Sequence, residues 1–193
     1  VGGFNVGSLL GFVTGGLIYG GFGYNGIGLG GFTYDGAKRG YIDRDGNIVI
    51  DSKNDKVWPM TWYGTVIKND GKTGFVNRKG EYVIRPGDYD VGDLDEINGL
   101  LVLKDGKTGR SGIFSVETGQ QVIPFRYDGI TFAGSDRLVV EKNGVRSLYN
   151  MRTGYSVFSV STDMTIDSFL HDRLTWVHQG SSNYEVINDQ GQI

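Results

Sequence analysis

Residues 40–50, GYIDRDGNIVI, recur 34 residues later as residues 74–84, GFVNRKGEYVI. Each copy begins with a glycine and a short apolar run, passes through a turn with a second glycine, and ends in another apolar run. Self-similarity at a period of this size is typical of repeat architectures such as solenoids and propellers. The two stretches therefore predict a repeat protein.

Three further copies follow, at residues 112–123, 147–158 and 185–193. A matching apolar run and turn precede them at 100–106, 137–144 and 173–180. The last copy stops at Ile193, before the closing Val-Ile run that the first three copies carry. We therefore expect about five repeats, and a final sheet that is one strand short.

Each repeat has the pattern of β structure. Runs of four to six Val, Ile, Leu, Tyr or Phe residues are separated by Asp-Gly, Asn-Gly, Lys-Gly or Thr-Gly, which supply the positive φ of tight hairpins. We find no sustained helical period. The chain is therefore predicted to be all-β, with three to four short antiparallel strands in each repeat. A propeller-like ring and an open solenoid both fit this pattern.

The composition excludes some classes of partner. The 193-residue chain has a net charge of −3 and no cluster of Lys and Arg, so we expect no nucleic-acid partner. It has no cysteine, and therefore neither a disulfide framework nor a thiolate metal site. A chain that starts at Val1 is typical either of a processed, exported protein or of a fragment.

The first 34 residues differ from the rest, because they hold thirteen glycines and no charged side chain. We predict a Gly-rich apolar assembly segment at 1–34 and a β-repeat domain at 35–193. Asn25-Gly26 predicts a hairpin in the first segment. Its flanks place bulky residues opposite one another and leave the other face as bare glycine, which lets another surface approach closely.

Residues 1–16 are compatible with two structures, because glycine recurs every four positions from Gly3 to Gly15. A glycine-zipper helix of this kind packs in membranes, so residues 1–20 could form a membrane anchor. In water each interior glycine costs a helix about 1 kcal/mol, which favours a strand. We expect the strand.

Such an apolar strand has to be buried against a partner, and the incomplete last repeat offers a place for it. It could close the ring within one chain, or join one chain to the next by strand addition. We favour the second arrangement, in which the chain is its own partner. The predicted assembly interface consists of Phe4, Val6, Leu10, Phe12, Tyr19, Phe22, Tyr24, Ile27 and Leu29.

Residues 69–84 (NDGKTGFVNRKGEYVI) and 118–128 (TGQQVIPFRYD) resemble the WG (KWG) repeat family of bacteria, and the resemblance extends over about 33–193. The family's signature Trp is absent, since Arg39, Thr73, Ser111 and Arg146 stand at its position. The resemblance implies a repetitive all-β body, often in exported or cell-surface proteins. It also implies no shared catalytic apparatus and functions that are mostly interactions.

No residue pattern predicts catalysis, a cofactor or a metal. Asp43-Arg44-Asp45-Gly46 is interpreted as a turn rather than a calcium loop, and the acidic run 88–96 as a solvated hairpin edge. The only histidines, His171 and His178, lack further ligands. The aromatic residues of the stretch 58–63 (Trp58, Trp62 and Tyr63) are interpreted as core rather than as a sugar-stacking site.

The sequence thus predicts a non-enzymatic structural subunit of a filament-like, extracellular or cell-surface assembly. It leaves two alternatives open. One is a monomeric β-repeat module that binds a protein or a glycan, with no cofactor. The other is a surface protein anchored in a membrane by its N-terminal segment.

Overall fold

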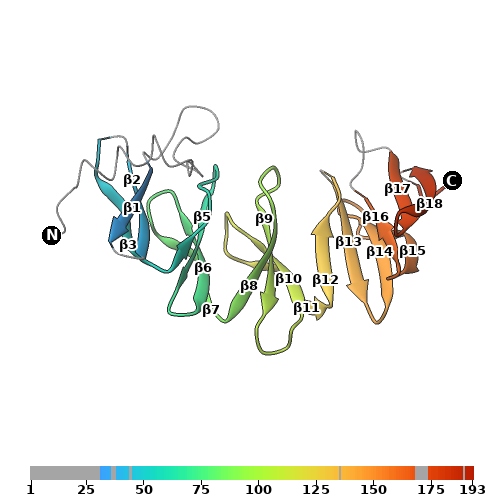
Figure 1. The fold of residues 1–193 in the computed structure, drawn as a ribbon, viewed down its shortest axis with the longest axis horizontal. Coiled ribbons are helices and arrows are strands. Elements are labelled where there is room, and N and C mark those ends of the chain that lie inside the picture. Colours follow the sequence, from blue (N-terminus) through green and yellow to red (C-terminus); the bar gives the residue numbers. More distant parts are fainter. Residues whose placement is uncertain (1–30, 36–37, 44, 135, 168–173, 189) are drawn as a thin grey trace. The chain divides into compact units, whose positions relative to one another are not determined.

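The computed structural model of the protein describes residues 31–35, 38–43, 45–134, 136–167, 174–188 and 190–193. Within these ranges the regular elements are eighteen β-strands, which form five antiparallel sheets of three or four strands (Figure 1). Each sheet is built from strands that follow one another in the chain. The prediction of an all-β chain with about five repeats is confirmed.

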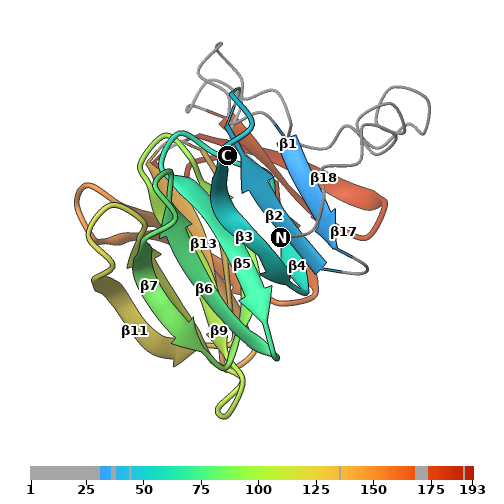
Figure 2. The ribbon, with the colours of Figure 1, turned by 90° about the vertical axis from the view of Figure 1, so that its left-hand side faces the viewer.

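The chain divides into two compact units, and the first comprises Val1–Asp88 together with Val116–Gly119. Its described strands form sheet A, in the order β1-β2-β3, and sheet B, in the order β4-β5-β6-β7 (Figure 2). The strands are β1 (Gly31–Asp35), β2 (Lys38–Ile42), β3 (Ile48–Asn54), β4 (Lys56–Val57), β5 (Gly64–Asn69), β6 (Lys72–Asn77) and β7 (Tyr82–Gly87).

The second unit comprises Tyr89–Ser115 and Gln120–Ile193. It holds sheet C, in the order β11-β10-β9-β8, sheet D, in the order β12-β13-β14-β15, and sheet E, in the order β16-β17-β18. The strands are β8 (Tyr89–Asp95), β9 (Leu100–Asp105), β10 (Ser111–Ser115), β11 (Gln121–Tyr127), β12 (Gly129–Phe132), β13 (Arg137–Lys142), β14 (Val145–Asn150), β15 (Ser156–Ser161), β16 (Met164–Ile166), β17 (Leu174–Gln179) and β18 (Ser182–Asn188).

The predicted hairpins between the second and third strands of a repeat are present. Asp70 and Gly71 join β5 to β6 with φ of 48° and 76°, and Asn143 and Gly144 join β13 to β14 with φ of 53° and 76°. Two successive positive φ angles define the type I′ turn, whose twist matches that of the flanking strands. Asx-Gly dipeptides therefore set the strand register in both repeats.

A second turn begins at the residue that follows the apolar run of each repeat, which is Asp or Asn in every repeat except that of sheet C, where it is Ser115. The Asp43 carboxylate accepts hydrogen bonds from the backbone N–H of Asp45 and of Asn47, at 3.0 and 2.7 Å. The Asn77 side chain accepts the equivalent pair from Lys79 and Glu81. Such Asx turns are what the short side chains of Asp and Asn favour. The described residues of this stretch, Asp43, Asp45 and Gly46, are therefore part of a turn, as predicted.

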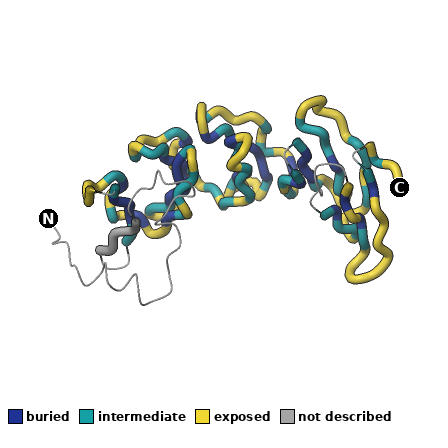
Figure 3. The backbone as a smooth tube through the Cα atoms, turned by 90° about the horizontal axis from the view of Figure 1, so that it is seen from above, coloured by how far each residue is buried: buried dark blue, intermediate teal, exposed yellow. Residues whose placement is uncertain are grey.

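The core consists of side chains that alternate along the strands. One cluster joins sheets A and B through Tyr41, Ile50, Val57, Ile67 and Val76. In the second unit, one cluster joins sheets C and D and another joins sheets D and E. Most of the buried residues lie within the strands, and buried and exposed stretches alternate along the backbone (Figure 3). Each sheet therefore buries apolar residues against its neighbour in the same unit.

Part of the predicted N-terminal segment is described. Residues Gly31–Asp35 form β1, which pairs antiparallel with β2 in the register Phe32 with Tyr41. The predicted hairpin at Asn25-Gly26 and the two alternatives for residues 1–16 lie outside the described residues. The predicted boundary between 1–34 and 35–193 stays a prediction.

Candidate functional site

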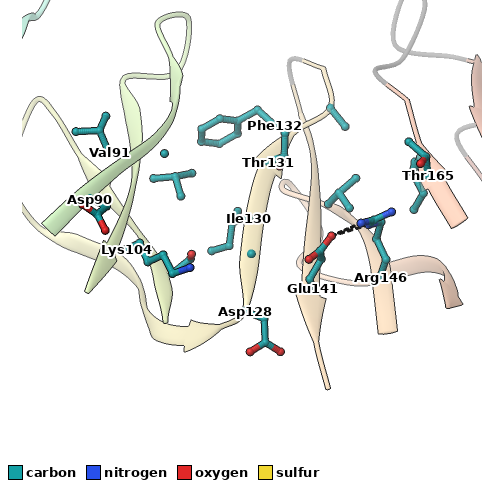
Figure 4. A pocket seen from close by; sticks show the side chains of 17 residues that line it. Asp90, Val91, Lys104, Asp128, Ile130, Thr131, Phe132, Glu141, Arg146 and Thr165 are labelled. Atoms are coloured by element: carbon teal, nitrogen blue, oxygen red, sulfur yellow. Dashed lines mark hydrogen bonds and ion pairs between the residues drawn. The ribbon is translucent and has the colours of Figure 1, made fainter. Parts of the chain in front are cut away.

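A cavity of about 470 Å³ lies in the second unit and is lined by residues of sheets C, D and E. The first strand of each of these sheets, β8, β12 and β16, contributes to the lining. Figure 4 shows Asp90 and Lys104 on the side of sheet C, Glu141 and Arg146 on the side of sheet D, and Ile130 between them. The size falls within the range of about 300–1,000 Å³ that is usual for ligand sites.

The floor of the cavity is aliphatic. Val102, Ile130 and Val139 line it and are at most 7% exposed, so they belong to the core at the same time. Val102 and Ile130 belong to the cluster that joins sheets C and D, and Val139 to the cluster that joins sheets D and E. The floor therefore offers an apolar ligand group a preformed surface.

Arg146 and Glu141 form an ion pair in the wall of the cavity (Figure 4). The Arg146 Nε donates to Glu141 Oε1 at 2.8 Å, and its Nη2 donates to the same oxygen. Its Nη1 donates to the backbone carbonyl of Met164, at the start of β16. One guanidinium thereby connects β13 and β14 of sheet D with sheet E, and the Arg146 side chain is held in place.

Two aspartates connect sheets C and D beside the cavity. The Asp93 carboxylate accepts a hydrogen bond from the backbone N–H of Phe132 at 2.9 Å. Asp128 forms an ion pair with Arg110 and accepts a hydrogen bond from the Asn143 N–H at 2.8 Å. Both carboxylates are therefore occupied by the protein, so that their role is to position β12 and the Asn143-Gly144 turn.

Asp90 and Lys104 remain available at the rim. They face each other across β8 and β9, and both are exposed. Neither forms an ion pair with another described residue within 4.0 Å, unlike the other charged residues of the lining. A ligand can therefore meet one free carboxylate and one free ammonium group above the aliphatic floor.

Two of the positions at which the family tryptophan is missing lie in this cavity. Ser111 and Arg146 both line it, whereas Thr73 is 1% exposed within sheet B. The same alignment extends to the fifth repeat, where Tyr184 stands at this position. Tyr184 is not among the residues predicted from the sequence, although its spacing from Asn188 matches that of Thr73 from Asn77.

The sequence-predicted assembly residues, from Phe4 to Leu29, lie outside the described residues, and their role stays a prediction. The acidic run is an edge, as predicted, because β8 is the last strand of sheet C. The run also stabilises the turn that follows β8, since the Asp95 carboxylate accepts hydrogen bonds from the backbone N–H of Ile97 and of Asn98.

The core interpretation of the aromatic stretch 58–63 is wrong for Trp62. This side chain is 60% exposed, and the guanidinium of Arg78 lies 6.0 Å from its ring. Trp58 and Tyr63 are half-buried. Trp58 contributes to the core mainly through its carbonyl oxygen, which accepts hydrogen bonds from the hydroxyls of Tyr41 and Thr65, both at 2.6 Å.

His178 lies on β17, and its Nε2 is 3.5 Å from a carboxylate oxygen of Asp167. Three or more potential metal ligands do not come together anywhere in the part of the chain that the structure describes. A search of the same residues for helices with the length and hydropathy of a membrane span finds none.

The model of the WG-containing repeat family matches residues 40–61 and 117–145. These two matched segments support the resemblance to WG repeats. The first matched segment spans β3 and β4 with the turn that precedes them, and the second spans β11, β12 and β13. The second WG-type match thus includes β12, which lines the cavity. Among curated proteins no match to the sequence was found.

Solved structures show remote similarity. Hsv2 from Kluyvelomyces marxianus has a TM-score of 0.48 and 10% identity over 81% of this chain and 58% of that one. A eukaryotic initiation factor has a TM-score of 0.49 and 12% identity over 81% and 47%. The WD40 β-propeller domain of Doa1 has a TM-score of 0.36 and 9% identity over 81% and 67%. This chain spans about half the length of the first two structures. Similarity of this degree carries no information about ligands.

Proposed function

We propose that this WG-repeat protein is a non-catalytic binding module that takes a segment of a partner protein into the cavity of its second unit. The observation that carries the proposal is the free pair of rim charges, Asp90 and Lys104, beside a buried aliphatic floor. Protein ligand sites combine an apolar surface with a few polar groups that set orientation and specificity.

The chemistry of the lining favours a peptide over a glycan or a nucleotide. Sugars stack on aromatic faces, and Phe132 is the one aromatic side chain among the seventeen described lining residues. Phosphates require clustered cations, but the lining carries three carboxylates, Asp90, Asp128 and Glu141, and only two cations. A peptide with an apolar side chain flanked by charges of both signs complements the floor and the rim.

The test is a selection from a library of displayed peptides of about nine residues, the length of the usual groove-bound segments. Selected peptides are then measured by fluorescence polarisation against Lys104→Glu and Asp90→Lys. Both residues are exposed, so we expect the variants to fold. We expect about a 10-fold loss of affinity for each, which corresponds to one interfacial charge contact.

The matched control is Lys107→Glu, which makes the same charge change at an exposed lysine outside the lining. A further variant, Thr131→Trp, places a large ring at an exposed position of the lining and should abolish binding. The proposal is wrong if Lys104→Glu and Lys107→Glu bind the peptides equally, or if the selection yields no peptide that Thr131→Trp excludes.

A second candidate function is favoured by a specific observation in the sequence, the absence of charge from the 34 N-terminal residues. We propose that this segment joins copies of the protein by strand addition into a filament-like, extracellular or cell-surface assembly. The test compares the sedimentation of the full chain with that of a chain starting at Thr33. Loss of large assemblies on truncation supports strand addition, and a monomeric full chain at high concentration contradicts it.

A further inference from the structure

One pair of residues occupies the same place in four of the sheets. One member lies in the middle of the second strand of a repeat. The other lies directly opposite it in the antiparallel register, in the middle of the third strand. We call it the central pair. Its members are Val66 and Phe75 in sheet B, Val102 and Ile113 in sheet C, Val139 and Leu148 in sheet D, and Trp176 and Val186 in sheet E.

The central pairs of sheets C and D are covered by the next sheet along the chain. Val102 and Ile113 pack in one cluster with Ile130, Leu138 and Val140 of sheet D. Val139 and Leu148 pack in the cluster that holds Ile166, Val177 and Ile187 of sheet E. In these two sheets of the second unit, the face that carries the central pair is therefore packed against the next sheet.

Sheet E departs from the rule. Its central pair is exposed, with Trp176 at 42% and Val186 at 37%, whereas no member of the other three pairs exceeds 7%. The opposite face of sheet E is buried in the usual way, since Val177 is 1% exposed. Strand alternation thus divides this sheet into a covered face and an outer face.

The outer face of sheet E is apolar and aromatic. Leu174 at 47% exposure and Tyr184 at 52% extend it on either side of the central pair. Trp176 and Tyr184 meet edge to face with ring centroids 5.9 Å apart, and His178 stacks on Tyr184 at 4.5 Å. None of these side chains is Lys, Arg, Asp or Glu, and the Asp167 carboxylate, which lies 3.5 Å from His178 Nε2, is 43% exposed beside them.

We propose that this outer face is a homodimer interface, in which sheet E of one copy packs face to face on sheet E of a second copy. In sheets C and D, the equivalent face is covered by another β-sheet. A two-fold arrangement needs only this one surface, because the same patch serves both subunits. Trp and Tyr are the residues that most often dominate such interfaces.

The aromatic geometry disfavours a glycan as the occupant. A sugar ring stacks on a free aromatic face, but one face of the Tyr184 ring is taken by His178, and Trp176 meets Tyr184 at an interplanar angle of 85°. The two large rings therefore do not form one flat platform. They instead form a ridge on the outer face of sheet E, and the same ridge of a second copy can pack against it.

The test is sedimentation velocity of the full chain between about 1 μM and about 500 μM, the concentration range in which a weak dimer forms and dissociates. We expect reversible self-association that a chain starting at Thr33 retains, which distinguishes this interface from strand addition by residues 1–34. Trp176→Lys places two like charges at the centre of the interface, so we expect the dimer dissociation constant to rise at least 10-fold.

The matched control is Trp62→Lys, which makes the same change at a tryptophan of the first unit that is 60% exposed. Tyr184→Ser is a second variant with a milder change at an exposed side chain, and far-UV circular dichroism confirms folding of each. A monomer at every concentration overturns the proposal. So does association that Trp176→Lys and Tyr184→Ser leave unchanged, or a monomer that uses Trp176 to bind a polysaccharide.

Discussion

The turn that follows β10 and the turn that follows β14 are locally the same, yet they have different neighbours. Each closes with a backbone hydrogen bond, from Ser115 to Gln120 at 2.9 Å and from Asn150 to Tyr155 at 3.0 Å. Each carries a glycine at its fifth position with φ of 72°. A Cβ on Gly119 would overlap the carbonyl oxygen of Val83, whereas a Cβ on Gly154 would meet open space.

The comparison separates two reasons for a glycine. At Gly154 the reason is local, since only the left-handed φ requires it. At Gly119 a second reason is added, because the Val116–Gly119 segment lies directly against β7 in the first unit. The burial of the neighbouring strand agrees, since Val83 is half-buried, whereas Val122, its counterpart one repeat later, is 56% exposed.

The close approach recurs elsewhere. Gly80 lies against the Val49 carbonyl, and Gly191 against the Val157 carbonyl. In these repeats the turn glycine meets a valine in the last strand of the preceding sheet. The glycine therefore contributes to the stacking of repeats as well as to the turn, and Gly154 is the exception in its own repeat.

Among these substitutions, Gly119→Ala should destabilise the protein most. The new methyl group collides with a backbone oxygen that cannot move without shifting β7, and the left-handed φ adds strain. We expect a loss of more than about 2 kcal/mol in the free energy of unfolding, measured by urea denaturation. A loss no greater than that of Gly154→Ala would show that the contact with Val83 is unimportant.

Gly191→Ala should have an intermediate effect. Its Cβ would lie 3.1 Å from the Val157 oxygen and 3.3 Å from the Phe158 Cβ, so that a small displacement relieves the crowding. We expect a loss of about 1–2 kcal/mol, mostly from the left-handed backbone. Thermal unfolding monitored by circular dichroism measures it. Destabilisation equal to that of Gly119→Ala would mean that the chain near Gly191 cannot shift.

Gly154→Ala isolates the local reason. With open space around the methyl group, the cost is the αL strain alone, about 1 kcal/mol. The same urea titration provides the value, with Gly119→Ala as its partner. Gly154→Asn sharpens the test, since asparagine tolerates this backbone and should recover part of the loss.

Asp43→Asn should have the smallest effect on stability, and the size of this effect should depend on pH. Hydrogen bonds from the Asn47 side chain and backbone lower the pKa of the Asp43 carboxyl below its usual value. A lowered pKa in the folded state stabilises the protein above the unfolded value of about 3.9, and this stability is lost as pH falls through the folded pKa. Asn77 makes the same turn without a charge.

The measurement is the midpoint of thermal unfolding between about pH 2 and about pH 6, the range in which aspartates titrate. We expect the variant to lose part of the acid-side slope and to stay near the parent at pH 6. Some slope should remain, since hydrogen bonds also lower the pKa values of Asp55, Asp105 and Asp163. An unchanged slope would show that Asp43 does not contribute to the pH dependence.

Much of the fold could be predicted because its signals are local. The runs 100–106, 137–144 and 173–180 became β9, β13 and β17, and the Asx-Gly dipeptides became the hairpins between strands. The candidate site could not be predicted in this way. Its rim charges, Asp90 and Lys104, come from two strands, and Arg146 reaches Met164 eighteen residues away. No spacing in the sequence indicates that these residues surround one cavity.

Trp62 and Trp176 illustrate the same limit, because both are large and apolar and both are exposed. Hydrophobicity favours burial, but whether a face is covered depends on which sheet packs on it. Tyr184 could have been found, because the repeat alignment places it at the family's tryptophan position. Its exposure on the outer face of sheet E could not.

The repeats, the strands and the turns follow from the amino-acid sequence, since backbone preferences and alternation of apolar residues act over a few neighbouring positions. Three features depend on how the sheets pack: which glycine touches a neighbouring strand, which described charges form no ion pair, and which of the equivalent faces stays open. Packing depends on distances between residues far apart in the chain, and such distances leave no local pattern.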